Sequence, residues 1–489
     1  MVDQFSSERV STAPSEEYHC FSEFRSPSFR LFPTPLHHME TSNQPSKAQP
    51  VRLTRRTFLS GASVAATALA FPFVSRLPVL GANNRLNIAG IGVGGKGWTD
   101  TTMCDSQNIV ALCDVDDRSA ANAWKRFPNA RRFRDFRVMF HEMGREIDAV
   151  TVSTPDHMHF PAAMWAIREK KHVYCQKPLT HTVGEARKLT AAARKAGVAT
   201  QMGNQGLANP LLRRDAEIVL SGILGDVVEM HCWTDRPGRW WSQSKPRPTD
   251  TPPIPAGLDW DLWLGSSPVR PYHSTYVPFH WRAYWDFGTG AIGDMGCHLL
   301  NLGALALDMS DPVAVEAESE GTNAETGPKW SRVTWEFPAR KGKPAFKFIW
   351  YDGAKLPSND LFHGKQAYAE NGVTVVGTKD VLYIPSHMGG GILKSGRAGD
   401  DLKDVPAIFP KSSDYERSHY EEWIAACKGG PKAYSNFDTA GPITETVLLG
   451  NVALRTGQRI EWNAKTGKVT NIKAANQFVE KHYRGGWGV

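Results

Sequence analysis

The sequence predicts an α/β protein whose N-terminal half is a doubly wound parallel sheet and whose C-terminal half belongs to the α+β class. Three observations lead to this prediction. A glycine-rich turn directly follows a short apolar segment at residues 86–91. Strand-like and amphipathic helical segments then alternate as far as residue 202 with short connections between them. After residue 206 the pattern changes to a run of strand-like segments with few helices.

The composition is that of a globular protein. The chain has 489 residues, of which 41% are hydrophobic and 22% charged, and this length predicts two or three domains. The net charge of +7 is spread along the chain, so we expect no nucleic-acid partner. None of the seven cysteines has the spacing of a metal site, and we expect no metal.

Residues 1–82 precede the predicted fold and resemble a twin-arginine export signal. Arg55 and Arg56 lead into an apolar-leaning segment that ends at Val74. This segment has about seventeen residues and contains polar ones, so we expect no stable membrane span. The twin-arginine export machinery is therefore an expected partner, and the periplasm or the exterior the expected location. The alternative interpretation is a chance arginine pair before a buried helix.

The boundaries of this leader are predicted from its spacing. Met39 would give the arginine pair a more usual distance from the start, so residues 1–38 are interpreted as a mis-called start. Cleavage is expected after Ala70 or after Ala82. The second site leaves a dinucleotide-binding domain at 83–205 and a second domain at 206–489.

The glycine-rich turn fits the G-x-G-x-x-G fingerprint of dinucleotide-binding proteins in two frames, starting at Gly90 or at Gly92. We favour Gly92, Gly94 and Gly97, because this frame leaves a full strand before the turn. The three glycines allow the tight turn, the close approach of a pyrophosphate and close helix packing. Asp114 follows the next strand, where a carboxylate binds a ribose hydroxyl and disfavours a 2′-phosphate. The cofactor is therefore expected to be NAD, with NADP disfavoured.

The alternation continues after Asp114. We expect strands at 147–152, 172–175 and 198–202 and helices at 160–169 and 183–196. Ligands of such sheets bind at the carboxyl ends of the strands. The residues at those ends that we expect at the cofactor are Thr154, Pro155, Gln176, Lys177 and Asn204, together with His159.

The second half is expected to begin with a helix at 211–221 and a strand at 227–233. The segment 235–257 is rich in Pro, Arg and Trp, which predicts a long ordered loop or a lid. Further strands are expected at 313–319, 331–337, 345–351, 373–377, 381–384 and 459–462, and helices at 415–428 and 444–456. The segment 389–401 is expected to be a flexible loop, and the C-terminal segment to pack back on the rest.

Several motifs together resemble the Gfo/Idh/MocA oxidoreductases over roughly residues 86–465. They are the glycine fingerprint, Thr154-Pro155-Asp156-His157-Met158-His159, Lys177-Pro178 after a strand, and the segment 285–298 with Gly293-Asp294-Met295-Gly296-Cys297-His298. The resemblance implies a Rossmann domain followed by an open, mainly antiparallel sheet. It also implies Lys177, Asp294 and His298 at the catalytic centre. The family's Glu-Lys-Pro signature carries Gln176 here, which can alter cofactor affinity or the pKa of Lys177.

The chemistry of these residues fits alcohol oxidation. Asp294 and His298 are four residues apart and would share one face of a helix. With a pKa near physiological pH, His298 is the candidate base. Lys177 would donate a hydrogen bond to the developing alkoxide, or share the base role if burial lowers its pKa. The cofactor carries the hydride chemistry, and the protein supplies position and electrostatics.

Tryptophan is concentrated beside the proposed catalytic segment. Seven of the sixteen Trp residues lie between 233 and 285. Sugar rings stack on aromatic faces, while arginine and aspartate bind hydroxyls. We therefore expect Trp281, Arg282, Trp285 and Asp294 to bind a carbohydrate or polyol, although core packing is expected to claim more than half of these tryptophans.

Three functions are compatible with these features. The first is an NAD-dependent oxidoreductase acting on a sugar or polyol. The second is a glycoside-cleaving enzyme that retains NAD and oxidises its substrate transiently, which export would favour because free NAD is scarce outside the cytoplasm. The third is a non-catalytic sugar-binding protein, supported only by Gln176. We also expect a homo-oligomer.

Overall fold

The computed structural model describes residues 84–340, 342–362 and 368–488. The predicted export signal and its cleavage sites lie outside these residues. Within the described part of the chain, no helix is long and apolar enough to cross a membrane.

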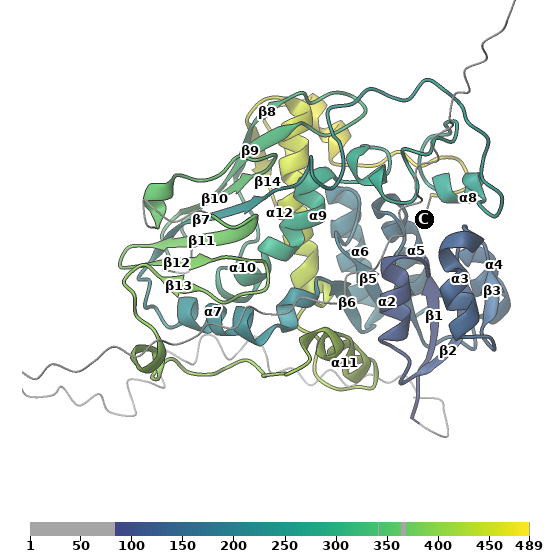
Figure 1. Cartoon of the computed structure of the whole chain (residues 1–489), viewed down its shortest axis with the longest axis horizontal. Helices are drawn as coiled ribbons and strands as arrows, with labels where there is room; N and C mark the ends of the chain where they lie inside the picture. Colours follow the sequence, from purple (N-terminus) through teal and green to yellow (C-terminus); the bar gives the residue numbers. More distant parts are fainter. Residues whose placement is uncertain (1–83, 341, 363–367, 489) are drawn as a thin grey trace, which may run out of the picture. The chain divides into compact units, whose positions relative to one another are not determined.

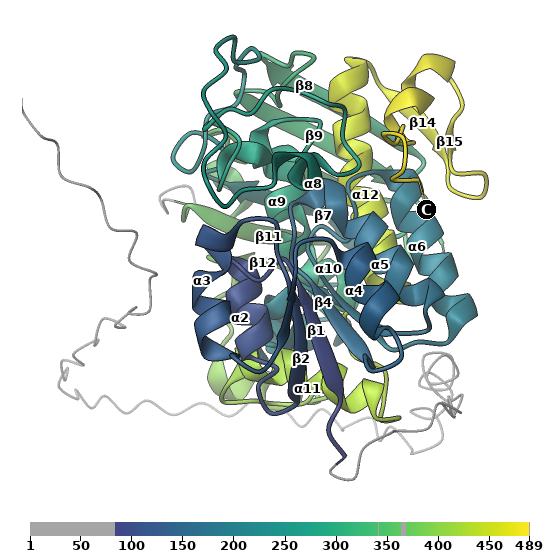
Figure 2. The same ribbon diagram turned by 90° about the vertical axis from the view of Figure 1, so that its right-hand side faces the viewer.

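The first sheet is parallel and doubly wound, as predicted, and its strand order is β3-β2-β1-β4-β5-β6. Helices α2 and α3 lie on one side of it and α4, α5 and α6 on the other (Figures 1 and 2). The strands are β1 (Asn87–Ile91), β2 (Asn108–Cys113), β3 (Arg131–Phe133), β4 (Ala149–Val152), β5 (His172–Gln176) and β6 (Thr200–Gly203). The helices are α2 (Lys96–Thr102), α3 (Asp117–Arg126), α4 (Phe136–Met143), α5 (His159–Arg168) and α6 (Val183–Ala196).

The second sheet is mainly antiparallel, as expected, with the order β13-β12-β11-β7-β10-β9-β8-β14-β15. Only β7 and β10 pair in parallel among its described strands. Its strands are β7 (Val227–Thr234), β8 (Ala314–Glu320), β9 (Trp330–Phe337), β10 (Phe346–Tyr351), β11 (Asn371–Gly377), β12 (Val381–Ile384), β13 (Ile392–Leu393), β14 (Ile460–Asn463) and β15 (Lys468–Val469).

Helix α12 (Phe437–Thr456) joins the two halves of the fold. It packs against α6 of the first half and against β8 and α9 (Gly290–Leu299) of the second. The remaining helices are α7 (Pro210–Leu220), α8 (Trp260–Leu264), α10 (Asn301–Ala306) and α11 (Tyr415–Cys427). The C-terminal segment thus packs back on the rest, as predicted.

Three expectations need correction. Helix α12 begins at Phe437 and not at residue 444, because Asn436 caps it and the helix accommodates Pro442 in its interior. Helices α3 and α4 were not predicted from the sequence. The third concerns the start of the segment expected to be flexible: a side chain at Gly389 would lie 2.2 Å from the Leu212 nitrogen, so this stretch packs closely on α7.

The loop expected between β7 and the next helix is present. Residues 235–259 form neither helix nor strand and lead from β7 to α8. Near its end the loop pairs with the connection between β2 and α3: the Asp259 amide donates to the Val115 carbonyl at 2.8 Å, and the Asp117 amide to Gly257 at 3.1 Å. It therefore runs from the second sheet to the cofactor edge of the first.

Candidate active site

The glycine turn has the geometry of the favoured frame. Gly92 follows β1 directly, with φ +74°, and a Cβ there would lie 2.9 Å from the Ser153 backbone. A Cβ on Gly97 would lie 1.8 Å from the Gly92 carbonyl oxygen, and one on Gly94 would lie 1.9 Å from Ser119 Oγ. None of the three positions has room for a side chain, and this is the cradle a dinucleotide phosphate requires.

Asp114 lies beside this turn and braces it. Its Oδ2 accepts hydrogen bonds from the amides of Val93 (2.8 Å) and Gly94 (3.1 Å), and its Oδ1 accepts one from the Asp116 amide (2.9 Å). Burial raises the pKa of Asp114, and these three amides oppose the rise. A carboxylate with four lone-pair sites retains acceptor capacity for a ribose hydroxyl.

The ends of β4, β5 and β6 meet at the same edge. Thr154 Oγ1 is buried there without a protein partner, as expected of a group that awaits a ligand. Pro155 follows it as the cap of a 3-10 turn. The glycine cradle, Asp114 and this unpaired hydroxyl together fit a dinucleotide.

Two predicted cofactor residues are occupied by protein contacts. His159 lies with Nδ1 2.7 Å from the Pro178 carbonyl and Nε2 2.8 Å from the Thr154 carbonyl, and burial lowers its pKa to about 4. Asn204 donates to Asn301 Oδ1 at 2.6 Å and accepts from Ser435. Their side chains therefore tie loops together at this edge.

Lys177 and Asp294 come together from opposite halves of the fold. Lys177, just after β5, donates from Nζ to Asp294 Oδ1 (2.8 Å) and to the Asp294 carbonyl (2.7 Å). Asp294 lies on α9 and also accepts from Arg282 Nε at 3.2 Å. Because an ammonium has three N–H groups, one donor of Lys177 remains for a substrate oxygen.

Arg236 is a third cation at this carboxylate and was not predicted from the sequence. It comes from the loop after β7, and its Nε lies 3.5 Å from Asp294 Oδ2. Burial alone would raise the pKa of Asp294. The charges of Lys177, Arg282 and Arg236 outweigh burial and hold this pKa well below its usual range. Asp294 is therefore ionised throughout the physiological range.

His298 lies one helical turn beyond Asp294, as expected, and faces a second imidazole. Its ring centroid is 5.6 Å from that of His387, which lies between β12 and β13. Burial, followed by the charges of Lys177 and His387, lowers the pKa of His298 well below its usual value. The expectation of a pKa near physiological pH is therefore wrong: the neutral form of His298 is favoured, so the imidazole holds no proton before the reaction.

His387 is held in place by the packing of its loop. The Gly391 amide donates to Asp215 Oδ1 at 2.9 Å, and Gly389 lies against α7. His387 has no hydrogen-bond partner among the described residues, and burial, Arg236 and Lys177 lower its pKa to about 4. His387 could not be predicted from the sequence, because it is more than eighty positions from His298 and only the fold brings the two together.

The predicted aromatic substrate contacts need correction. Trp281 and Trp285 are 8% and 6% exposed, and their indole nitrogens donate to the carbonyls of Pro278 and Asn323. Burial leaves them little face for a sugar. Trp240 is 45% exposed instead, and the Arg236 guanidinium lies 4.4 Å from its ring centroid.

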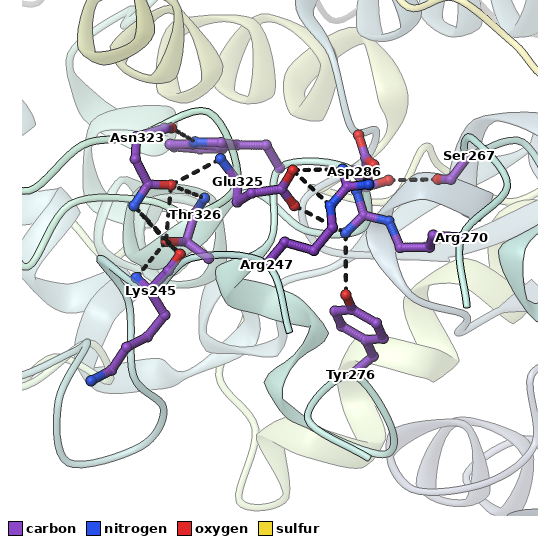
Figure 3. A network of polar contacts seen from close by, with 10 residues as sticks. Lys245, Arg247, Ser267, Arg270, Tyr276, Asp286, Asn323, Glu325 and Thr326 are labelled. Carbon is purple, nitrogen blue, oxygen red and sulfur yellow. Dashed lines mark hydrogen bonds and ion pairs between the residues drawn. The ribbon is translucent and has the colours of Figure 1, made fainter. Parts of the chain in front are cut away.

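A second ion-pair network fixes the chain next to the site. Figure 3 shows Arg270 between Asp286 and Glu325, and Arg247 paired with the same Glu325 carboxylate. Arg270 Nη1 donates to Glu325 Oε2 at 3.2 Å, and the Arg270 side chain is only 3% exposed. The network connects the long loop to the segment just before α9, which carries Asp294.

Comparison with protein families identifies both halves. The profile of an oxidoreductase family with an NAD-binding Rossmann fold, Gfo/Idh/MocA, matches residues 85–204. The profile of the C-terminal α/β domain of the same family matches residues 213–341. Together they cover about half of the chain.

Curated relatives match over shorter stretches. The inositol 2-dehydrogenase of Rubrobacter xylanophilus is 28% identical over 159 residues, which are 31% of this chain and 45% of the relative. The 1,5-anhydro-D-fructose reductase of Ensifer adhaerens is 49% identical over 53 residues, 11% of this chain and 16% of the relative. The chain thus matches less than half of the length of either enzyme.

Solved structures share the fold. The WlbA dehydrogenase from Bordetella pertussis, solved with NADH and UDP-GlcNAcA, has a TM-score of 0.55 and 15% identity over 78% of this chain and 99% of its own. The aldose–aldose oxidoreductase from Caulobacter crescentus, solved with glycerol, has a TM-score of 0.50 and 17% identity over 77% of this chain and all of its own.

Proposed function

The chain belongs to the Gfo/Idh/MocA oxidoreductase family, and from this we propose that it transfers hydride between NAD and a hydroxyl-bearing carbon of a sugar or polyol. The observation that carries the proposal is the convergence of Lys177, Asp294 and His298 at the carboxyl edge of the NAD-binding sheet. The names of the inositol and anhydrofructose enzymes support a polyhydroxy substrate.

Each residue has a distinct role in the proposal. Bound NAD supplies the hydride acceptor. His298, held neutral by its surroundings, takes the hydroxyl proton. Lys177 directs its remaining N–H to the same oxygen and stabilises the developing negative charge. Asp294 keeps that ammonium in place through its side chain and its carbonyl.

Gly92, Gly94 and Gly97 would cradle the pyrophosphate, and Asp114 would bind the ribose hydroxyls. Thr154 is proposed to donate its unpaired hydroxyl to the cofactor. Arg282 and Arg236 are proposed to contact substrate oxygens. We also propose, from the sequence of residues 1–82, that the protein is exported through the twin-arginine machinery.

Two measurements on purified protein test the function. Denaturation followed by an assay for released NAD(H), together with titration of added NADH, measures cofactor binding. Incubation with myo-inositol, aldoses, sugar acids and aryl glycosides then follows NADH absorbance and aglycone release.

The outcomes separate the candidates. NADH formation supports the dehydrogenase, whereas aglycone release without net NADH supports the redox-neutral glycoside cleavage. Absence of NAD(H) binding would refute both.

A further inference from the structure

A buried carboxylate lies behind the proposed cofactor site. Asp100, on α2, is fully buried and accepts hydrogen bonds from four side chains, one on its own helix and three from other parts of the fold. Its donors are Lys96 Nζ (2.5 Å), the Tyr420 hydroxyl (2.6 Å), Ser153 Oγ (2.6 Å) and Gln176 Nε2 (2.9 and 3.1 Å). These contacts saturate the acceptor sites of one carboxylate.

The amide of Gln176 has only one favourable orientation here. Its Nε2 donates to both oxygens of Asp100, and its Oε1 accepts from the Lys177 amide at 3.3 Å. The side chain packs over Gly203, where a Cβ would lie 2.5 Å from Nε2. A glutamate at 176 would therefore place a second carboxylate against Asp100.

The pair lies where the elements of the cofactor site meet. Ser153 follows β4 and touches the Gly92 turn, where an added Cβ would lie 2.9 Å from the Ser153 backbone. Gln176 ends β5 and immediately precedes Lys177. Asp100 thus links the glycine turn, the end of β4 and the lysine-bearing end of β5.

We propose that Asp100 is a positioning residue of the NAD site and that it forms a carboxylate–amide pair with Gln176. The pair needs one negative charge, which Asp100 carries in this chain and which a carboxylate at position 176 could carry instead. In this chain the residue before Lys177 is thus a neutral amide, and the carboxylate beside it belongs to Asp100 on α2. The inference rests on the proposed function, because NAD is the ligand that the pair positions.

The test is a charge exchange, with NADH binding as the readout. Gln176→Glu, Asp100→Asn and the double variant D100N/Q176E are titrated with NADH by fluorescence at pH 5.5 and 8.5. Asp148→Asn is the matched control. It removes one carboxylate from the same domain at the opposite end of β4, where Asp148 accepts from the Asn87 amide.

Two adjacent carboxylates share a proton at low pH and repel when both ionise. We expect Gln176→Glu to bind NADH within about threefold of the wild type at pH 5.5 and at least tenfold more weakly at pH 8.5. D100N/Q176E, which restores one carboxylate and one amide, is expected to recover to within about threefold at both pH values. Asp100→Asn alone should weaken NADH binding at both pH values, whereas Asp148→Asn should leave NADH binding unchanged at both.

Unchanged NADH binding by Gln176→Glu at pH 8.5 would refute the proposed pair. So would a double variant that binds NADH no more tightly than Gln176→Glu at this pH. A merely structural contact would lower the melting temperature without a pH-dependent change in NADH affinity. If Gln176→Glu does not fold, the NADH affinity of the double variant decides alone: near-wild-type binding supports the pair, and tenfold weaker binding refutes it. A wild type that binds no NADH would instead refute the proposed function.

Discussion

Lys177 and His298 illustrate what single residues contribute to this site. Their proximity to Asp294 could be predicted, because Lys177 and His298 each lie in a motif that is recognisable in the sequence. The charge state of His298 could not, since it depends on burial and on Lys177 and His387, which only the fold brings near. Arg236 was missed for the same reason: a loop arginine carries no local signal of the carboxylate it will meet.

Replacing Lys177 by methionine tests this electrostatic coupling. Loss of the ammonium should move the pKa of His298 upward toward its usual value, because the Lys177 charge is one of the causes that lower it. We expect kcat to fall about 100- to 1000-fold while NADH binding is kept. Imidazole NMR titration of Lys177→Met against exposed Lys188→Met measures the shift, and an unchanged His298 titration would contradict the coupling.

The glycine frame gives a second residue-level prediction. In Gly97→Ala the added Cβ meets a backbone oxygen that cannot move aside, so NADH affinity should fall by about 100-fold or more. Gly485→Ala, at a position with nothing within 4 Å, is the control and should bind normally. Calorimetric titration with NADH distinguishes them, and equal affinities would refute the favoured frame.

At the level of elements, the bounds of a helix could be predicted where the residues that begin and end it are recognisable in the sequence. Helix α6 has the predicted bounds, because Thr182 and Glu185 form a capping box and Gly197 ends it in the left-handed conformation. Helix α12 was predicted to begin at residue 444, whereas Asn436 caps it and Pro442 lies in its interior. The β12–β13 loop was misjudged because its glycines serve close packing on α7, and this packing places His387 in the site.

Asp215 anchors that loop and gives it a pH-dependent stability. Burial raises its pKa from 3.8 to about 7, so the folded protein holds a proton that the unfolded chain has lost. Stability from this group therefore decreases as pH rises from about 4 to about 7. Asp215→Asn has no carboxyl group to titrate at this position, so it should not lose this stability. The free energy of unfolding of Asp215→Asn relative to the wild type should therefore rise by on the order of 2 kcal/mol between pH 5 and 8.5.

Thermal melts across this range, with exposed Asp226→Asn as control, measure the difference. A gap between Asp215→Asn and the wild type that stays constant with pH would show that Asp215 does not titrate in this window.

At the level of the whole molecule, both sheet classes could be predicted, whereas the contacts that join the halves could not. Helix α12, the long loop and the Arg270 network connect segments that are distant in sequence. Such contacts depend on tertiary packing, which a single sequence pattern does not encode. The tryptophans show this well, since Trp281 and Trp285 are used for packing while Trp240 keeps an exposed face.

Removing Arg270 should destabilise this connection. Arg270→Met leaves Asp286 and Glu325 without their buried cation, which we expect to cost about 3–5 kcal/mol. Arg247→Met removes a half-exposed partner of the same glutamate and should cost no more than about 1 kcal/mol. Urea unfolding compares the two variants, and equal losses would mean that Arg270 has no special role in joining these segments.

The central claim is hydride transfer at the Lys177–His298 site, and a deuterium label follows the hydride itself. Polyols and sugars deuterated at their carbinol carbons are mixed with the NAD-loaded protein, quenched within a single turnover, and the nicotinamide is analysed by mass spectrometry. We predict deuterium on the nicotinamide ring with the wild type, and labelling that is about 100- to 1000-fold slower with Lys177→Met. Substrate turnover that leaves the nicotinamide unlabelled would contradict the account.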